Sequence, residues 1–413
     1  MAQEIVLHTG APENVTQVPF VDIGNHISTV FFTSNQATTI NGTAYRNVLE
    51  IDWSFFGQKY QSFLAGDFTF DTTTMKPISG NVYAYFEGYS VSNFTWFADN
   101  LNVPIKNFTD AITGNAADPN SSVLWSIILS QPTTFIGSTG ADTITGGNSA
   151  DTLTPGGGND IINGGGGINT AIYAGTLKQY TIANNAGVIT ITDSLSARDG
   201  TDTLTNIQHI QFTDYSINTT MKAEAAKLPT ATVNSIVELY VAYFARTPDA
   251  TGLAYWIDKA AGGESLTAIS KEFYNAGVQF SSLTGYSATM ANADFIKLVY
   301  TNVLGRSGAT APPDADVAYW DNQIKIGATT KEGLIQTMLT AAHSFANDPT
   351  WGWVPKLLDN KISVGYQAAV TYGLDYNSSS DAITQGMAIA HAVTSSDTTA
   401  AVGLIGVAGH VLL

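Results

Sequence analysis

Residues 137–172 read GSTGADTIT-GGNSADTLT-PGGGNDIIN-GGGGINTAI and repeat with a period of nine without a gap. The sixth position of the four units is occupied by Asp142, Asp151, Asp160 and Asn169. The eighth position is occupied by Ile144, Leu153, Ile162 and Ala171. A flexible linker would not keep an acidic and an aliphatic residue in register over successive units, so this stretch specifies a structure.

Each position of the nonapeptide has a physical role. Glycines at the start of a unit allow positive φ and a sharp turn, which directs several main-chain carbonyl groups inward. The aspartate adds a carboxylate to these carbonyls, and together they offer the oxygen ligands that Ca²⁺ prefers. The aliphatic residue lies in a short extended segment and faces inward, while the threonines beside it favour a strand and face outward. The stretch therefore predicts cation-binding turns that alternate with short strands.

The four units resemble the nonapeptide G-G-x-G-x-D-x-U-x of RTX (repeat-in-toxin) proteins, which forms a parallel β-roll around calcium. The resemblance implies that two nonapeptides make one turn, so that loops on the same side lie 18 residues apart. Asp142 and Asp160 would then line one edge, and Asp151 and Asn169 would line the other. Because the first edge has two carboxylates and the second has one, we expect tighter binding at the first.

The predicted calcium ligands comprise loop residues and the side chains at position six. They are Gly137, Thr139, Asp142, Gly146, Asn148, Asp151, Gly157, Asp160, Gly166, Asn169, Asp199 and Asp202. Asp214 is a further candidate, although aspartate is also common at turns for conformational reasons alone. The array departs from the pattern at Ser149, at Pro155 and in the fourth unit, so the number of bound ions stays open.

The sequence after the repeats, residues 171–214, resembles the segment that closes many RTX arrays. We expect short strands at 180–182 and 188–192, with a turn at 184–185 between them. The N-terminal part, residues 1–132, is expected to be β-rich. Its clearest element is a hairpin in which AGDFTFD and GNVYAYFEGY flank the turn TTTMKPIS.

Beyond Pro229 the apolar period becomes helical. One face of the expected helix carries Ile236, Leu239, Tyr240, Tyr243 and Phe244, and Pro248 is expected to end it. Residues 237–266 then parallel residues 296–330. The shared landmarks are Arg246 with Arg306, Tyr255-Trp256 with Tyr319-Trp320, and Phe280 with Phe345.

This duplication resembles a helical domain of unknown function that is found duplicated in type I-secreted and surface-layer proteins. That domain is in turn distantly similar to phycobilisome linker domains. The resemblance covers roughly residues 230–350. Aromatic residues at helical spacing are more often core than ligand platforms, so the Tyr-Trp pairs are interpreted as core rather than as a sugar-binding surface. The two arginines are expected to cap or pair locally.

Composition limits the classes of function. The chain has 17 Lys and Arg against 34 Asp and Glu, a net charge of −17, which argues against a nucleic-acid or anionic-membrane partner and favours cations. It has no cysteine, which excludes disulfides and thiolate metal sites. No stretch reaches 18 consecutive apolar residues, so membrane insertion is not expected.

The ends of the chain point to the route of export. Residues 1–15 lack a basic region followed by a long apolar one, so no cleaved leader is expected. Residues 376–413 contain no Lys or Arg and resemble the uncleaved C-terminal signal of type I secretion; an ordinary packed helix is the alternative. Cytosolic calcium would be too low to fill weak sites, and folding would follow binding outside the cell.

The expected architecture is a multidomain α+β protein. Its parts are a β-rich N-terminal domain (1–132), a short parallel β-roll with Ca²⁺ and closing strands (133–218), a mostly α-helical duplicated domain (219–375) and a C-terminal type I secretion signal (376–413).

Catalytic motifs do not point to an enzyme. The sequence has no H-E-x-x-H, no G-x-S-x-G and no Walker loop, and its six histidines are scattered. A catalytic carboxylate pair is left open, and no catalytic residue is predicted.

The leading hypothesis is a secreted structural protein of the cell surface or extracellular matrix, similar to a surface-layer protein, that assembles with itself when calcium binds. Its further partner would be the type I secretion machinery. The alternative is an extracellular protein that binds surface glycans or another ligand, with the aromatic N-terminal domain holding it. An unrecognised secreted hydrolase ranks third.

Overall fold

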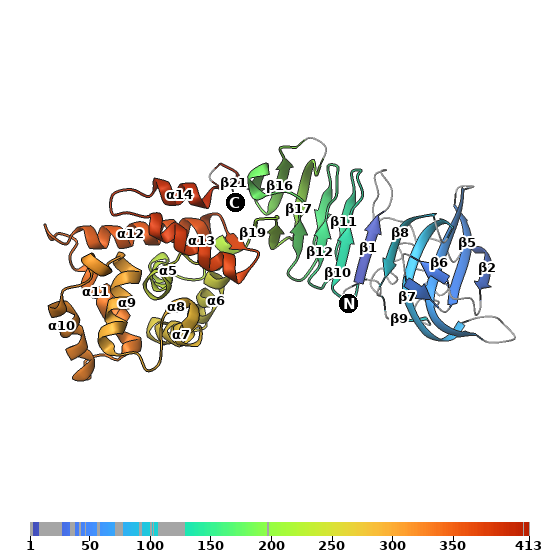
Figure 1. The fold of residues 1–413 in the computed structure, drawn as a ribbon. Helices are drawn as coiled ribbons and strands as arrows, with labels where there is room; N and C mark the ends of the chain where they lie inside the picture. Colours follow the sequence, from blue (N-terminus) through green and yellow to red (C-terminus); the bar gives the residue numbers. More distant parts are fainter. Residues whose placement is uncertain are drawn as a thin grey trace. The chain divides into compact units, whose positions relative to one another are not determined.

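The computed structural model describes residues 3–7, 27–33, 38–40, 43–45, 47–55, 58–70, 77–90, 93–99, 101, 103–105, 129–195, 198–407 and 409–412. The chain forms two compact units, Met1–Thr213 and Asp214–Leu413 (Figure 1). Strands dominate the first unit and helices the second, which confirms the predicted α+β class. The boundaries proposed at residues 132 and 375 remain predictions.

The first unit begins with an antiparallel sheet. Its strands, in spatial order, are β2 (Ile27–Thr33), β5 (Asn47–Phe55), β6 (Gln58–Phe70), β7 (Pro77–Ser90), β8 (Asn93–Asp99) and β1 (Gln3–Leu7). The predicted hairpin is β6 and β7, which pair antiparallel. β9 (Val103–Pro104) pairs with β7, and β3 (Thr38–Ile40) pairs with β4 (Thr43–Tyr45). Buried side chains between these elements include Tyr45, Val48, Phe63, Ala65 and Ala84.

β1 joins this sheet to the repeats. It pairs antiparallel with β8 on one side and parallel with β10 (Thr133–Ile136) on the other. The sequence analysis did not anticipate this connection, because strand pairing between residues more than a hundred positions apart leaves no local signal.

The repeats form two parallel sheets on alternate nonapeptides (Figure 1). One sheet contains β10, β12 (Thr152–Thr154), β14 (Thr170–Ile172) and β18 (His209–Gln211). The other contains β11 (Thr143–Thr145), β13 (Ile161–Asn163) and β17 (Thr201–Thr205). The position-eight residues Ile144, Leu153, Ile162 and Ala171 are at most 1% exposed and fill the space inside the roll. Two nonapeptides therefore make one turn, as the resemblance implies.

A hairpin interrupts the roll before its last strands. It comprises the 3₁₀ helix Leu177–Gln179, β15 (Tyr180–Asn185) and β16 (Val188–Asp193). Its turn is Ala186–Gly187, both with positive φ, two residues beyond the predicted 184–185. Glycine takes this conformation readily, which fixes the turn there. Below the roll, the rings of Tyr173, Tyr180 and Phe212 contact one another.

The second unit is mainly helical. Its helices are α4 (Met221–Ala225), α5 (Thr230–Phe244), α6 (Ala250–Ala261), α7 (Leu266–Gln279), α8 (Ser281–Thr284), α9 (Asn292–Leu304), α10 (Asp314–Lys325), α11 (Lys331–His343), α12 (Trp353–Tyr366), α13 (Ser379–Ala392) and α14 (Thr399–Ile405). α12 runs on into a π-helical turn, Gln367–Thr371. β19 (Tyr215–Asn218) pairs antiparallel with β20 (Leu374–Tyr376), and β21 spans Val411–Leu412.

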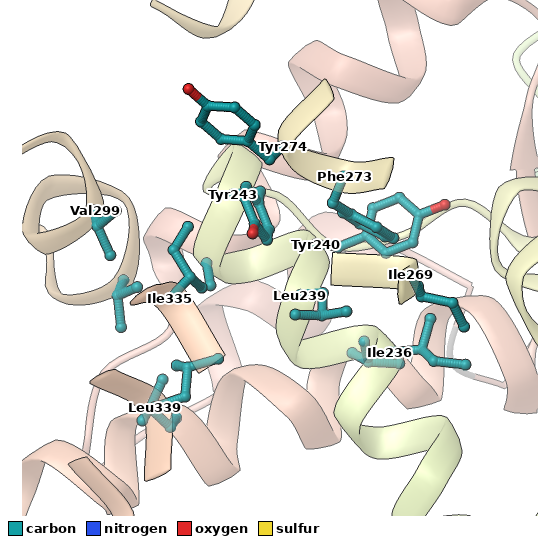
Figure 2. Close-up of a cluster of buried hydrophobic side chains, with 14 of the residues drawn as sticks. Ile236, Leu239, Tyr240, Tyr243, Ile269, Phe273, Tyr274, Val299, Ile335 and Leu339 are labelled. Carbon is teal, nitrogen blue, oxygen red and sulfur yellow. The ribbon is translucent and has the colours of Figure 1, made fainter. Parts of the chain in front are cut away.

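α5 is the central helix of this unit. On the predicted face Ile236, Leu239, Tyr240 and Tyr243 are buried and Phe244 is half-buried. The valines on the other sides are buried too, at Val233, Val237 and Val241. Figure 2 shows Ile236, Tyr240 and Tyr243 of α5 among side chains from α7, α9 and α11. The helix ends at Phe244 because Ala245 adopts the left-handed conformation, before Pro248 is reached.

The duplication is visible as two helix triplets in the same order, α5–α6–α7 and α9–α10–α11. Arg246 pairs with Asp249 at 2.9 Å, and the Arg306 Nε donates to the Thr310 carbonyl at 2.9 Å, so both arginines act locally. The interpretation of the Tyr-Trp pairs as core holds for Trp320, which is 8% exposed, but not for Tyr255 and Tyr319, which are more than half exposed.

The C-terminal segment is folded in the structure. α13 buries Ala382, Ile389 and Ala390, and α14 buries Ala401 and Ile405. In the described part of the chain, no helix combines the length and the hydrophobicity needed to cross a membrane.

Candidate calcium site

Three carboxylates stack along one side of the roll. Asp142, Asp160 and Asp202, here called the Asp edge, occupy position six of successive turns and are each at most 2% exposed. The Asp142 N–H donates to Asp160 Oδ1 at 2.7 Å, and the Asp160 N–H donates to Asp202 Oδ1 at 2.9 Å. Each aspartate thus ties its turn to the one before it.

The opposite side has the same ladder with fewer charges. Asp151, Asn169 and Gln208 form what we call the amide edge. The Asp151 N–H donates to Asn169 Oδ1 at 2.9 Å, and the Asn169 N–H donates to Gln208 Oε1 at 2.8 Å. The 18-residue spacing therefore places Asp142 with Asp160 and Asp151 with Asn169, as expected.

The two edges differ in how their second oxygen is satisfied. Asp142 Oδ2 accepts from the Ser138 N–H, and Asp151 Oδ2 accepts from the Gly147 N–H, both at 2.7 Å. Asn169 instead donates from Nδ2 to the carbonyls of Gly166 and Asn206, at 3.1 and 3.0 Å. These two carbonyl oxygens belong to loops that would face a bound cation. At the Asn169 turn the side-chain amide donates hydrogen bonds to them in place of a cation.

Asp160 Oδ2 is buried and has no hydrogen-bond partner, and among the described side chains it is the one buried polar atom in that state. Burial, with the neighbouring charges of Asp202 and Asp142, raises the pKa of Asp160 to about 8. Burial also raises the pKa of Asp202, to about 6. A buried oxygen without a partner is costly, so the Asp edge lacks a positive group at this point.

The loops that carry these residues stack with very little space. Gly158 has a φ of +130°, and a Cβ there would lie 2.5 Å from the Gly140 carbonyl oxygen one turn away. Gly200 has a φ of +76°, and its Cβ would lie 1.8 Å from the Gly158 carbonyl oxygen. The carbonyl groups of successive loops are therefore brought close together along the Asp edge.

The segment that closes the roll contributes Asp202 to the Asp edge and places Asp199 beside it. Asp202 Oδ2 accepts from the Tyr173 hydroxyl at 2.9 Å, and Asp199 Oδ2 accepts from the Tyr180 hydroxyl. Arg198 lies beside Asp199, with Nε 3.7 Å from its carboxylate, and pairs with Asp193 at 2.6 Å. Asp199 thus already has a cationic neighbour, whereas no ion pair is found for Asp160 or Asp202 among the described residues.

The structure distributes the other predicted ligands over the two edges. Gly137, Thr139 and Gly157 lie in loops of the Asp edge, and Gly146, Asn148 and Gly166 lie in loops of the amide edge. The side chains of Thr139 and Asn148 are exposed, so a contribution from either would come through its main-chain carbonyl. Asp214 lies in the other compact unit, Asp214–Leu413.

Sequence reasoning missed Gln208, Asn206 and the hydroxyls of Tyr173 and Tyr180. The place of Asp202 on the Asp edge does have a sequence signal, because DTLT at 202–205 repeats DTLT at 151–154. No comparable signal marks Gln208, since the inserted hairpin breaks the nine-residue spacing.

The donor set fits a hard cation. Within the described residues, no three acidic or histidine side chains gather as in a conventional metal centre. The Asp edge offers instead one carboxylate per turn and main-chain carbonyls, which are oxygen ligands suited to Ca²⁺ rather than to zinc. The orphaned Asp160 oxygen supports the same fit.

The profile of the family described as RTX calcium-binding nonapeptide repeat (4 copies) matches residues 136–171. The repeats are RTX calcium-binding nonapeptides. The RTX roll therefore identifies Ca²⁺ as the cofactor, and it indicates a secreted protein. A second profile, a domain of unknown function (DUF4214), matches residues 279–347, which contain the second helix triplet. Neither description names an enzyme.

No curated protein matches the chain. Among solved structures, the crystal structure of extracellular lipase LipA from Serratia marcescens is similar over 22% of this chain and 17% of that chain, with 24% identity and a TM-score of 0.14. The chain thus matches only a small part of that lipase.

Proposed function

We propose that this protein is a calcium-dependent structural component of the cell surface or extracellular matrix, whose RTX roll becomes stable when Ca²⁺ occupies the Asp edge. The carrying observation is the stack of three buried carboxylates in which Asp160 Oδ2 has no partner. A bound cation would supply that partner and balance the charge of Asp142 and Asp202. Asp142, Asp160 and Asp202 would hold it together with loop carbonyls.

Calcium supplies charge and coordination in this proposal. Extracellular calcium modules bind with dissociation constants of ~10⁻⁴–10⁻³ M, so the sites would fill outside the cell and stay empty in the cytosol. Binding energy would then become folding energy after export. Type I secretion fits this order of events, with residues 376–413 as the signal, which folds as α13 and α14 after passage.

Self-assembly is supported by the outer surface of the roll. Ile161, on the outer face of β13, is 57% exposed, and Ile168, in the loop before β14, is 63% exposed; threonines line the outer faces of the strands. Exposed aliphatic residues on a β surface and its flanking loop favour association with another copy. This surface exists only once the roll has formed, which would make assembly depend on calcium.

The test is sizing by light scattering, with electron microscopy, at millimolar calcium and after chelation. We expect ordered assemblies in calcium and monomers in chelator. A protein that stays monomeric at every concentration in calcium contradicts the assembly proposal. Ile161→Thr and Ile168→Thr should weaken assembly without changing calcium binding, which separates the two parts of the proposal.

The second candidate is an extracellular protein that binds a ligand. It is favoured by two cavities in the helical unit, described below, rather than by the N-terminal β-sheet.

A further inference from the structure

The helical unit contains two cavities, of about 660 and 400 Å³. Both volumes lie within the ~300–1,000 Å³ typical of small-molecule sites. The first lies between the first helix triplet and residues 375–387 of β20 and α13, and the second lies beside the second triplet and α12. Neither was expected, because the Tyr-Trp pairs were interpreted as core.

The two cavities occupy the same place in the two copies. The first is lined by Tyr240, Arg246, Trp256 and Phe280, and the second by Tyr300, Arg306, Trp320 and Phe345. In each case these residues come from the first helix of the triplet, the loop after it, the second helix and the segment that follows the third helix. Apart from Tyr255, which does not line the first cavity, the landmarks of the duplicated sequence are thus walls of two similar hollows.

Their internal geometry is also shared. The Arg246 guanidinium lies 4.9 Å from the centre of the Tyr240 ring, and that of Arg306 lies 5.8 Å from the Tyr300 ring. Trp320 donates to the Tyr300 hydroxyl at 3.2 Å in the second cavity, and Trp256 and Tyr240 line the first cavity together. Both hollows open to solvent, and similar tyrosine, arginine and tryptophan walls in two copies are better explained by a shared kind of ligand than by chance.

Charge limits the kind of ligand. In the first cavity Arg246 is paired with Asp249, and Asp375 adds a second carboxylate that accepts from the Thr251 N–H at 3.3 Å. These carboxylates disfavour an anion. A cation gains little as well, because the charges of Arg246 and Asp249 balance each other and burial raises the pKa of Asp375, which favours its neutral form.

A neutral ligand with an apolar face and polar edges remains. Aromatic walls from Phe244, Trp256 and Phe280 stand beside the carboxylates of Asp249 and Asp375 and the hydroxyl of Ser379, which can exchange hydrogen bonds with ligand hydroxyls. A sugar ring presents C–H groups on its faces and hydroxyls on its edge, which suits such a mixture.

We propose that each helix triplet binds one neutral sugar unit, with the larger and more polar first cavity as the stronger site. Two sites in one chain suit a polymeric glycan, since the first contact raises the effective concentration for the second. This inference is independent of the calcium site and of assembly, and either could fail alone.

The experiment titrates the full-length protein in calcium with glucose, galactose, mannose, N-acetylglucosamine and their oligomers, followed by saturation-transfer NMR and tryptophan fluorescence. Glucuronate and choline serve as anionic and cationic comparisons. Phe280→Ala removes the rim of the first cavity, and Phe345→Ala that of the second. Both side chains are exposed enough, at 54% and 38%, for the fold to survive. Tyr255→Ala is the matched control, because Tyr255 is 53% exposed on the same triplet but does not line the first cavity.

We expect saturable binding of at least one neutral sugar, weakened ~10-fold or more by Phe280→Ala and unchanged by Tyr255→Ala. Phe345→Ala should leave monosaccharide binding nearly intact and reduce the gain from longer oligomers. The inference is overturned if no neutral sugar saturates the protein, if glucuronate or choline binds in preference, or if Phe280→Ala and Tyr255→Ala behave alike.

Discussion

Replacing Asp160 by asparagine should have opposite effects with and without calcium. Without calcium, burial raises the pKa of Asp160 in the wild-type roll from 3.8 to about 8, so that this group is mostly protonated in the folded roll at pH 7. Each pKa unit corresponds to ~1.4 kcal/mol, and taking up this proton at pH 7 costs the metal-free roll about 4 kcal/mol relative to the ionised unfolded chain. Asparagine removes this cost but buries an amide, which costs ~1–3 kcal/mol if unpaired.

The net result at pH 7 is a metal-free roll stabilised in Asp160→Asn, by about 2 kcal/mol if the new amide stays unpaired. The gain approaches ~4 kcal/mol if the amide donates to the Gly157 carbonyl, as Asn169 donates to the Gly166 carbonyl in the next repeat. Because the folded-state pKa is raised, the wild-type cost appears as pH rises above 3.8 and is complete above about 8. The advantage of asparagine should therefore vanish at pH 4.

In calcium the sign reverses. Asparagine offers a neutral oxygen in place of a carboxylate, so we expect the calcium midpoint for folding of the roll to rise by ~10-fold or more. The matched control is Asn169→Asp at the equivalent position of the amide edge. It adds a buried carboxylate and removes the amide that satisfies Gly166 and Asn206, so it should destabilise the metal-free roll and strengthen its dependence on calcium.

The assay is hydrogen exchange of the full-length protein, read in the proteolytic peptides that cover β11 to β14. Exchange is followed as urea is raised in chelator and, separately, as the calcium concentration is raised. These peptides report on the roll and not on the helices. If Asp160→Asn destabilises the metal-free roll at pH 7, or leaves the calcium midpoint unchanged, the account of the Asp edge is refuted.

Three further changes test other parts of the structure. Gly158→Ala should prevent the roll from forming in calcium, because alanine would be strained at this positive φ and its Cβ would clash with the Gly140 carbonyl. Gly187→Ala, at φ +90° with open space around it, should cost only about 1 kcal/mol. Equal losses of hydrogen-exchange protection in the two variants would contradict the stacking of the loops. Lys361→Met should stabilise the helical unit by about 2 kcal/mol at pH 7, since burial lowers the pKa of Lys361 to about 8 and only one hydrogen bond, to the Val303 carbonyl, is lost. The gain in stability should fade as pH rises from 8 to 10.5, because the buried lysine loses its charge near pH 8 and the lysine of the unfolded chain near pH 10.5. The measurement is urea unfolding followed by circular dichroism of the helices. A gain that does not change with pH would contradict the prediction. Removal of calcium by chelator should strongly lower protection in the roll and leave that of α5 nearly unchanged, and a parallel loss in both would show that the units do not unfold separately.

Local patterns made much of the fold predictable. The nine-residue period, read with the RTX resemblance that places two units in one turn, predicted the register of Asp142 with Asp160 and of Asp151 with Asn169. The helical face of α5 and the β6–β7 hairpin follow from apolar spacing. In each case the signal lies within a few neighbouring residues.

Features that depend on distant residues were not predictable. The parallel pairing of β1 with β10 and the rung at Gln208 require contacts across long stretches of sequence. The unpartnered oxygen of Asp160 depends on the conformation of its own loop. In the first repeat the second residue, Ser138, donates its N–H to Asp142. The equivalent residue of the third repeat, Gly156, takes a φ of +91° instead. The cavities beside Trp256 and Trp320 arise from helix packing, which spacing does not reveal.

The most direct measurement is anomalous diffraction from crystals grown in millimolar calcium. The account predicts density for an ion within ~2.3–2.6 Å of Asp160 Oδ2, between loops of the Asp edge, and none beside the amide of Asn169. An empty Asp edge in a folded, calcium-soaked roll, with Asp160 Oδ2 still unpartnered, would contradict it.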